Sequence, residues 1–199
     1  PLVPSLQAAG EGIAAAKVLD ESLQKLPDSL TLLSLRAEAA IKDNDEATAL
    51  RCLRRVVQKD PLRHHENVTL ARLLWGTADQ AEAVACLQRV VKAFPDDVSS
   101  RGMLGQYYLE NGNAHSAISL LEEAVKRATP GSVIESKLKT FLAAACLAAG
   151  KTEVERHQLE KAAGYFQQTI EVDTGSLEGY AELAHVYVGL RQYRHAAET

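Results

Sequence analysis

Apolar residues recur at helical spacing along this chain, in stretches that each end at a proline. Residues three and four positions apart lie on one face of a helix, so each apolar stripe predicts an amphipathic helix. Two such stripes comprise Ala49, Leu50, Leu53, Val56 and Val57, and Ala83, Val84, Leu87, Val90 and Val91. Proline cannot continue a helix, so it marks the expected helix end.

These prolines are regularly spaced. Pro27, Pro61, Pro95 and Pro130 follow one another at intervals of 34, 34 and 35 residues. The stretch "CLRRVVQKDP" returns one interval later as "CLQRVVKAFP". A period near 34 is the length of a helix–turn–helix repeat. We call the two predicted helices of each repeat helix A and helix B.

The residues after the prolines predict where the next helix begins. "PDSL", "PDDV" and "PGSV" each place a short polar side chain before an apolar residue. Ser29, Asp97 and Ser132 are therefore expected N-caps, and Ser176 in "TGSL" has the same role. Ser132 and Glu135 have the spacing of a capping box.

The stretch "LGQYYLENGNAHSAISLLEEAV" resembles the tetratricopeptide repeat (TPR) family. Its matching residues are Leu104, Gly105 and Tyr108 in helix A, Gly112 in the turn, and Ala117 and Ala124 in helix B. The last repeat follows the same template with Tyr180, Leu183, Ala184, Tyr187, Tyr193 and Ala196, whereas the second departs from it at Arg36, Ala37 and Ala40.

The resemblance implies an all-α, right-handed superhelical solenoid of about twelve helices. Residues 1–199 then form one domain of six repeats, at about 1–28, 29–62, 63–96, 97–131, 132–175 and 176–199. The first repeat begins near Pro4, inside its helix A, and the last stops inside helix B. We therefore expect an excerpt of a longer chain, or open ends through which copies could self-associate.

The fifth repeat is longer than the others. In the fourth repeat Ala117 follows Gly112 by five residues. In the fifth, the matching pair Gly150 and Ala162 is separated by seven residues more. The extra residues lie within "KTEVERHQLEK" and are largely charged. We expect them to extend helix B or to project into solvent, and whether residues 151–158 are functional is left open. Glycines 10, 112 and 150 are expected in turns.

Composition and charge exclude several classes of function. The net charge is −4, so no strongly basic field exists to hold nucleic acid. The longest apolar run, residues 141–149, is too short to span a bilayer, so no membrane partner is expected. Three scattered cysteines do not form a disulfide framework, which favours a reducing, cytoplasmic setting.

Candidate chemistry is sparse. Cys52 and Cys86 hold equivalent positions in two B helices, and Cys146 lies in an A helix, so all three are expected to be buried, reduced and unliganded. The adjacent His64 and His65 point to different helix faces and make a poor metal pair. No nucleophile elbow, zincin motif or phosphate-binding glycine loop is present. The sequence thus predicts no enzyme, cofactor or metal.

In the TPR family the A helices line a concave groove. By helical phase, the residues expected to face it are Glu38, His65, Arg72, Trp75, Gln106, Lys137 and His185, together with Ser34. Trp75 either packs between repeats or forms, with Arg72 one turn earlier, an anchor for a partner side chain, since both residue types are enriched in binding hot spots. The carboxylate clamp of TPR co-chaperones is absent, which argues against a chaperone-tail binder.

Two functions follow. The first is a scaffold that binds a partner peptide or helix in the groove. The alternative is RNA binding, because the lengthened fifth repeat and the Tyr-rich repeat after it resemble the interferon-induced proteins with tetratricopeptide repeats. The expected groove carries few cations, namely Arg72, Lys42 and Lys137, against Glu38, Glu110 and Glu178. The balance of charge favours the scaffold.

Overall fold

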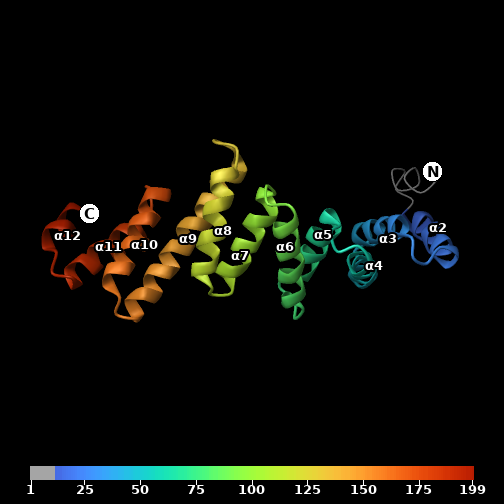
Figure 1. Cartoon of the computed structure of the whole chain (residues 1–199), viewed down its shortest axis with the longest axis horizontal. Helices are drawn as coiled ribbons and strands as arrows, with labels where there is room; N and C mark the ends of the chain where they lie inside the picture. Colours follow the sequence, from blue (N-terminus) through green and yellow to red (C-terminus); the bar gives the residue numbers. More distant parts are fainter. Residues whose placement is uncertain (1–11) are drawn as a thin grey trace. The chain divides into compact units, whose positions relative to one another are not determined.

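The computed structural model describes residues 12–199, which form eleven α-helices and, in that range, no strand (Figure 1). The prediction of an all-α chain is confirmed. The helices are α2 Gly12–Lys25, α3 Leu30–Lys42, α4 Glu46–Lys59, α5 His64–Leu74, α6 Gln80–Ala93, α7 Val98–Glu110, α8 Ala114–Arg127, α9 Val133–Glu155, α10 Leu159–Val172, α11 Leu177–Gly189 and α12 Tyr193–Glu198. The helix expected near Pro4 and the turn expected at Gly10 lie outside the described residues.

Helix ends follow the prolines, as predicted. Helices α2, α4, α6 and α8 end two or three residues before Pro27, Pro61, Pro95 and Pro130. The predicted N-caps are also confirmed: the side chains of Ser29, Asp97, Ser132 and Ser176 each accept a hydrogen bond from a backbone N–H of the first helical turn. The capping box is only half formed, because Glu135 Oε2 accepts from the N–H of Gly131 and not from that of Ser132.

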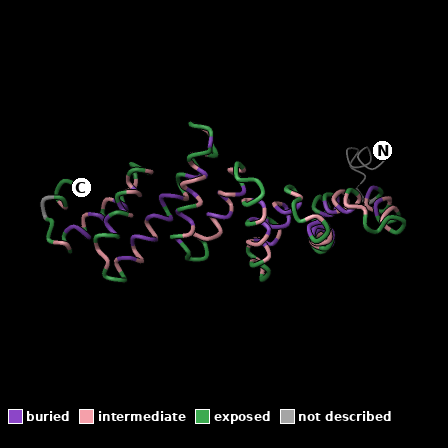
Figure 2. Tube along the Cα trace, in the orientation of Figure 1, coloured by how far each residue is buried: buried purple, intermediate pink, exposed green. Residues whose placement is uncertain are grey.

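The chain divides into two compact parts, Pro1–Phe94 and Pro95–Thr199, which we call the N-terminal and C-terminal parts. In the N-terminal part, helix A α3 packs on helix B α4, and helix A α5 packs on helix B α6. Helix B α2 packs on α3, and α4 packs on α5. The core between them consists mainly of aliphatic side chains, among them Leu19, Leu33, Val56, Leu70, Leu74, Leu87 and Val90. Each helix therefore buries one stripe and exposes the opposite face (Figure 2).

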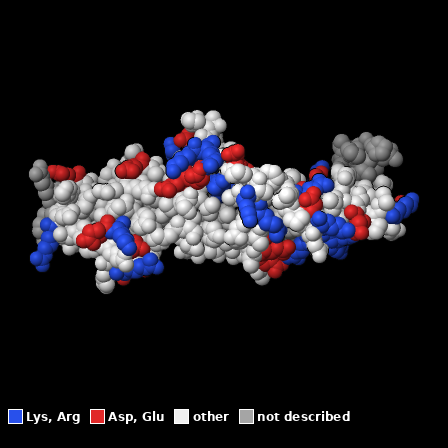
Figure 3. Space-filling view, viewed as in Figure 1, with Lys and Arg blue, Asp and Glu red and all other residues white. Residues whose placement is uncertain are grey.

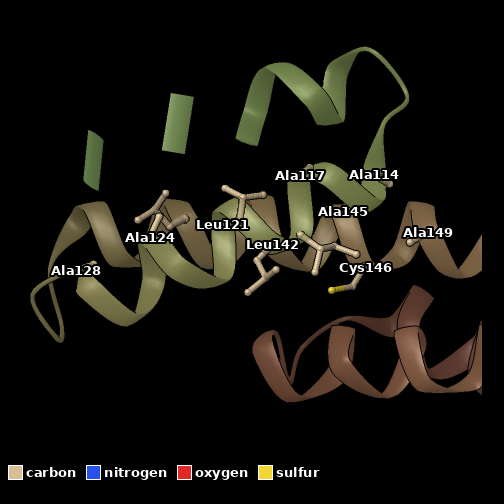
Figure 4. Close-up of a cluster of buried hydrophobic side chains, with 11 residues drawn as sticks. Ala114, Ala117, Leu121, Ala124, Ala128, Leu142, Ala145, Cys146 and Ala149 are labelled. Atoms are coloured by element: carbon tan, nitrogen blue, oxygen red, sulfur yellow. The ribbon is translucent and has the colours of Figure 1, made fainter. Parts of the chain in front are cut away.

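In the C-terminal part, A helices α7, α9 and α11 pair with B helices α8, α10 and α12. A buried cluster joins α8 to α9 and is rich in alanine: Ala117, Ala124, Ala145 and Ala149 surround Leu121 and Leu142 (Figure 4). Small side chains let the two helices approach closely while the leucines fill the remaining space. A second cluster, centred on Phe166 and Leu183, joins α10 to α11.

The expected position of the fifth repeat's extra residues is wrong. They extend helix A, since α9 runs for 23 residues where α7 and α11 have 13, and α10 begins only at Leu159. Gly150 is a buried residue within α9 and not a turn glycine, and the turn lies at His157 (φ 59°). The inserted side chains do not all face solvent, because Glu153 is buried. The physical reason is that the inserted Lys, Glu and Val residues continue the helical run of Ala and Leu without a helix breaker that outweighs it.

Candidate partner-binding surface

The residues expected to face the groove lie on A helices or at their ends. Glu38 is on α3, His65 and Arg72 are on α5, Gln106 is on α7, Lys137 is on α9 and His185 is on α11. All are exposed except Gln106, which is half-buried. Glu38, Arg72, Gln106 and His185 occupy one position of the repeat, because each lies equally far along the chain from its N-cap at residue 29, 63, 97 or 176.

In the N-terminal part, a buried hydrogen bond joins the two A helices. Ser34 on α3 donates its hydroxyl to Glu66 Oε1 on α5 at 2.6 Å. The same carboxylate oxygen lies 3.5 Å from Nη1 of Arg63 and belongs to a residue that is only 6% exposed. The hydroxyl and the guanidinium beside this carboxylate offset the cost of burying its charge. Helices α3 and α5 therefore meet at Ser34 and Glu66, and each also has an exposed residue at the same repeat position, Glu38 on α3 and Arg72 on α5.

Trp75 lies at the end of α5 and not within the helix. Helix α5 ends at Leu74, and Trp75 is its C-cap, with extended backbone (φ −64°, ψ 125°). The backbone N–H of Trp75 donates to the carbonyl of Arg72 at 3.3 Å. Gly76 follows in the left-handed region (φ 79°), a common way for a helix to stop. Trp75 is half-buried, so part of its ring stays accessible beside the end of α5.

Near this helix end lies a cavity that the sequence reasoning missed. Ile41 at the end of α3, Asn44 and Glu46 at the turn into α4, and Leu73 of α5 line a space of about 260 Å³. Leu73 directly follows Arg72 in the chain. Ile41 is 36% exposed, so it offers apolar area at this cavity. The signal was the isoleucine in "AAIKDND", which the groove template does not include.

In the C-terminal part, exposed side chains form polar contacts along one A helix and between two A helices. Gln106 donates its side-chain amide to Glu110 Oε1 at 2.7 Å, one turn along α7. Lys151 of α9, the first residue of the insertion, lies with Nζ 2.6 Å from Glu178 Oε1 on α11. This hydrogen bond raises the pKa of Lys151 above its ordinary value. One inserted residue thus links two A helices, whereas Lys137 and His185 remain exposed.

The three cysteines are buried, as predicted. Burial raises the pKa of Cys146 to about 12 and also raises the pKa values of Cys52 and Cys86. A thiol with a raised pKa stays protonated at neutral pH, so it is a poor nucleophile and a poor metal ligand. Within residues 12–199, no three His, Cys, Asp or Glu side chains gather in a way that could hold a metal ion.

Comparison with known proteins bears on both sequence and fold. Residues 68–133 match the family model described as tetratricopeptide repeat. No curated protein sequence matches. The crystal structure of MamA is similar at 17% identity, with 87% of this chain and 95% of that chain covered and a TM-score of 0.62.

Two further structures are similar. The structure of YrrB, "a TPR protein with an unusual peptide-binding site", shares 18% identity over 89% of this chain and 86% of that chain, with a TM-score of 0.62. A chain of Naa15/Naa10 bound to HypK-THB shares 20% identity over 97% of this chain and 29% of that chain, with a TM-score of 0.66. The chain has the fold of TPR solenoid proteins. The resemblance to interferon-induced proteins gains no support from these comparisons.

The TPR fold is typical of scaffolds that bind other proteins and carry no catalytic site. Across the described residues, none of the helices is both long enough and apolar enough to cross a membrane.

Proposed function

We propose that this protein is a non-enzymatic scaffold that binds a partner peptide or helix along the exposed faces of its A helices. The observation that carries the proposal is the face shared by α3 and α5. Arg72 is followed in the chain by Leu73, which lines the 260 Å³ cavity. Trp75 is the C-cap of the same helix. The peptide-binding site of YrrB and the HypK-THB bound to Naa15/Naa10 support it, since both occur on proteins with this fold.

The chemistry of this face describes the partner. Arg72 offers a planar fork of donors that suits a carboxylate. Glu38, at the same repeat position on α3, attracts a cation. Ile41, Leu73 and Trp75 offer apolar area. The matching partner segment carries an apolar side chain together with one acidic and one basic residue. In the C-terminal part, the proposed contact residues are Gln106, Lys137 and His185.

The proposal also concerns the cellular setting. Free, buried cysteines are typical of reducing compartments, so we place the protein in the cytoplasm. RNA binding remains the alternative. It predicts capture of RNA that weakens steeply with salt, because neutralised phosphates release counterions.

Affinity capture from lysate with a double variant, Arg72→Ala with Trp75→Ala, tests the proposal. We expect capture of the protein partner to weaken at least tenfold, as for the loss of hot-spot residues, while helical circular dichroism stays unchanged. The matched control is Lys92→Ala with Phe94→Ala, which removes an exposed cation and an exposed aromatic from the same part of the chain.

Two outcomes would contradict the proposal, and a third would require a second variant. Unchanged capture by the folded double variant places the site elsewhere. Equal weakening in the control shows that the effect is not local. Loss of helical structure shows that Trp75 is a core residue, and Arg72→Ala alone then tests the surface.

A further inference from the structure

One face of α4 gathers the guanidinium groups of the N-terminal part. Thr48, Arg51, Cys52 and Arg55 follow one another at helical spacing and line a cavity of about 240 Å³. Its other walls come from α2, with Asp20, and from α3, with Arg36. Lys and Arg side chains gather over α4 in the space-filling view of Figure 3. The cavity is lined by residues of α2, α3 and α4, and none of them belongs to the candidate partner-binding surface described above.

The charges lining this cavity do not balance. Three arginines and one carboxylate, that of Asp20, line it. Just outside the lining, the carboxylate of Asp28 is shared by Arg55 at 3.5 Å and Lys59 at 2.8 Å. The carboxylate of Asp45 also lies near Arg36 and Arg51, and it keeps its negative charge as the N-cap of α4, where it accepts the N–H of Thr48 at 3.1 Å. The four cations Arg36, Arg51, Arg55 and Lys59 thus exceed the three carboxylates by one charge. A local surplus of positive charge in a concave site attracts anions.

Two of the arginines are held in place. Arg36 donates Nε to Asp20 Oδ1 at 2.7 Å and Nη2 to Oδ2 at 3.3 Å, and its side chain is only 12% exposed. Arg55 donates Nη2 to the carbonyl of Pro27 at 2.6 Å. Their positions are therefore largely set before any ligand arrives, which lowers the entropy cost of binding.

Arg51 is the available donor. It is exposed, and its contact within residues 12–199 is a hydrogen bond from Nη2 to Thr48 Oγ1 at 3.2 Å. Burial raises the pKa of Cys52, and the charges of Arg36, Arg51 and Arg55 each oppose that rise. All three arginines thus line one cavity.

We propose that this cavity binds a phosphomonoester group, carried either by a phosphorylated peptide side chain or by a free phosphate. Arginine forks match phosphate oxygens in pairs, and Arg51 brings such a fork to the cavity lining. At about 240 Å³ the cavity is large enough for a phosphoryl group with several waters, but it is smaller than the pockets that enclose drug-sized ligands. This site does not depend on the proposed scaffold function, because none of its lining residues is one of the proposed partner-contact residues.

Isothermal titration calorimetry tests the site with three probes: inorganic phosphate, a glycine pentapeptide with a central phosphoserine, and the same peptide without the phosphate. We expect the two phosphate-bearing probes to bind and the third not to bind. Arg51→Gln should weaken binding at least tenfold. The matched control is Arg54→Gln on the other face of α4, where Arg54 pairs with Asp79 and Glu82; it should leave binding unchanged.

Each outcome of the titration either identifies the ligand or refutes the proposal. Tenfold tighter binding of the phosphopeptide than of inorganic phosphate assigns the site to phosphorylated protein; equal affinities assign it to a free anion. The proposal fails if neither phosphate-bearing probe binds, or if Arg51→Gln and Arg54→Gln weaken binding equally. If Arg51→Gln unfolds, Arg51→Lys replaces it: that variant keeps the charge but loses the fork, and unchanged binding by it refutes the arginine geometry.

Discussion

Gly150 of α9 lies directly against the ring of Phe166 of α10, so closely that a methyl group at Gly150 would stand 2.8 Å from both Cδ1 and Cζ of the ring. Gly105 of α7 has the same relationship to Leu121 of α8, with side-chain carbons at 2.7 and 2.9 Å. In both pairs an A helix uses the missing side chain of glycine to approach a large residue of helix B. Packing, and not the turn, explains the glycine at residue 150.

The contact with Phe166 predicts the effect of Gly150→Ala. Because Phe166 is fully buried and cannot move away freely, the added methyl group should lower the free energy of unfolding by about 1–3 kcal/mol. Urea denaturation monitored by circular dichroism measures it. Gly164→Ala is the control: Gly164 is a helical glycine with open space around it, so alanine should stabilise by about 0.5–1 kcal/mol. Equal effects of the two substitutions would contradict close packing at Gly150.

The cap of α9 predicts a second change in stability. Ser132 accepts the N–H of Glu135 at 3.1 Å, so Ser132→Ala should lower the free energy of unfolding by about 1 kcal/mol. Ser132→Asp should restore it. Ser119→Ala, at an exposed site within α8, should have an effect below about 0.5 kcal/mol. A loss at Ser119 as large as that at Ser132 would argue against capping as the cause.

Burial of the cysteines predicts slow labelling. In the native protein a thiol reagent should react with Cys52, Cys86 and Cys146 at rates limited by opening of the structure, and in guanidinium chloride all three should react at once. Spectrophotometric titration of the thiols follows both reactions. Rapid labelling of three thiols before unfolding would show that the cysteines are accessible.

The raised pKa of Cys146 also predicts a pH dependence. The folded value is about 12 and the ordinary value is 9.0, so the folded state keeps a proton that the unfolded state releases. This contribution to stability is complete below pH 9 and is lost as the pH rises toward 12. Cys146→Ala should make the unfolding midpoint depend less on pH between 9 and 11. An identical slope in the variant and the parent would contradict it.

In acid, the N-cap of α4 predicts a stability that falls as the pH falls, opposite to the effect of Cys146 in base. Hydrogen bonds from Thr48 lower the pKa of Asp45 below its ordinary value of 3.8. Its contribution to stability is therefore present above pH 3.8 and is lost as the pH falls through the lowered folded value. Asp45→Asn keeps the cap without a titrating charge and should flatten the stability profile below pH 4. Asp96→Asn, at an almost fully exposed carboxylate, is the control and should leave the profile unchanged.

Much of the fold was predictable from the sequence because its signals are local. The proline period, the apolar stripes and the capping residues Ser29, Asp97, Ser132 and Ser176 each act within one or two helical turns. Helix starts, helix ends and the burial of the cysteines follow from them. The candidate surface was predictable to the extent that Glu38, Arg72 and His185 are exposed on A helices.

The sequence by itself thus determined the repeated helix–turn–helix fold, whereas the tertiary structure decided how its irregular positions are used. From the sequence, Gly150 is predicted to be a turn residue, but in the structure it packs against Phe166. Trp75 is predicted to lie on an A helix, but α5 ends before it and Gly76 follows in the left-handed region. The arginine cavity needs side chains from α2, α3 and α4 together. Contacts between helices depend on which faces meet, and residues far apart along the chain carry no local record of that meeting.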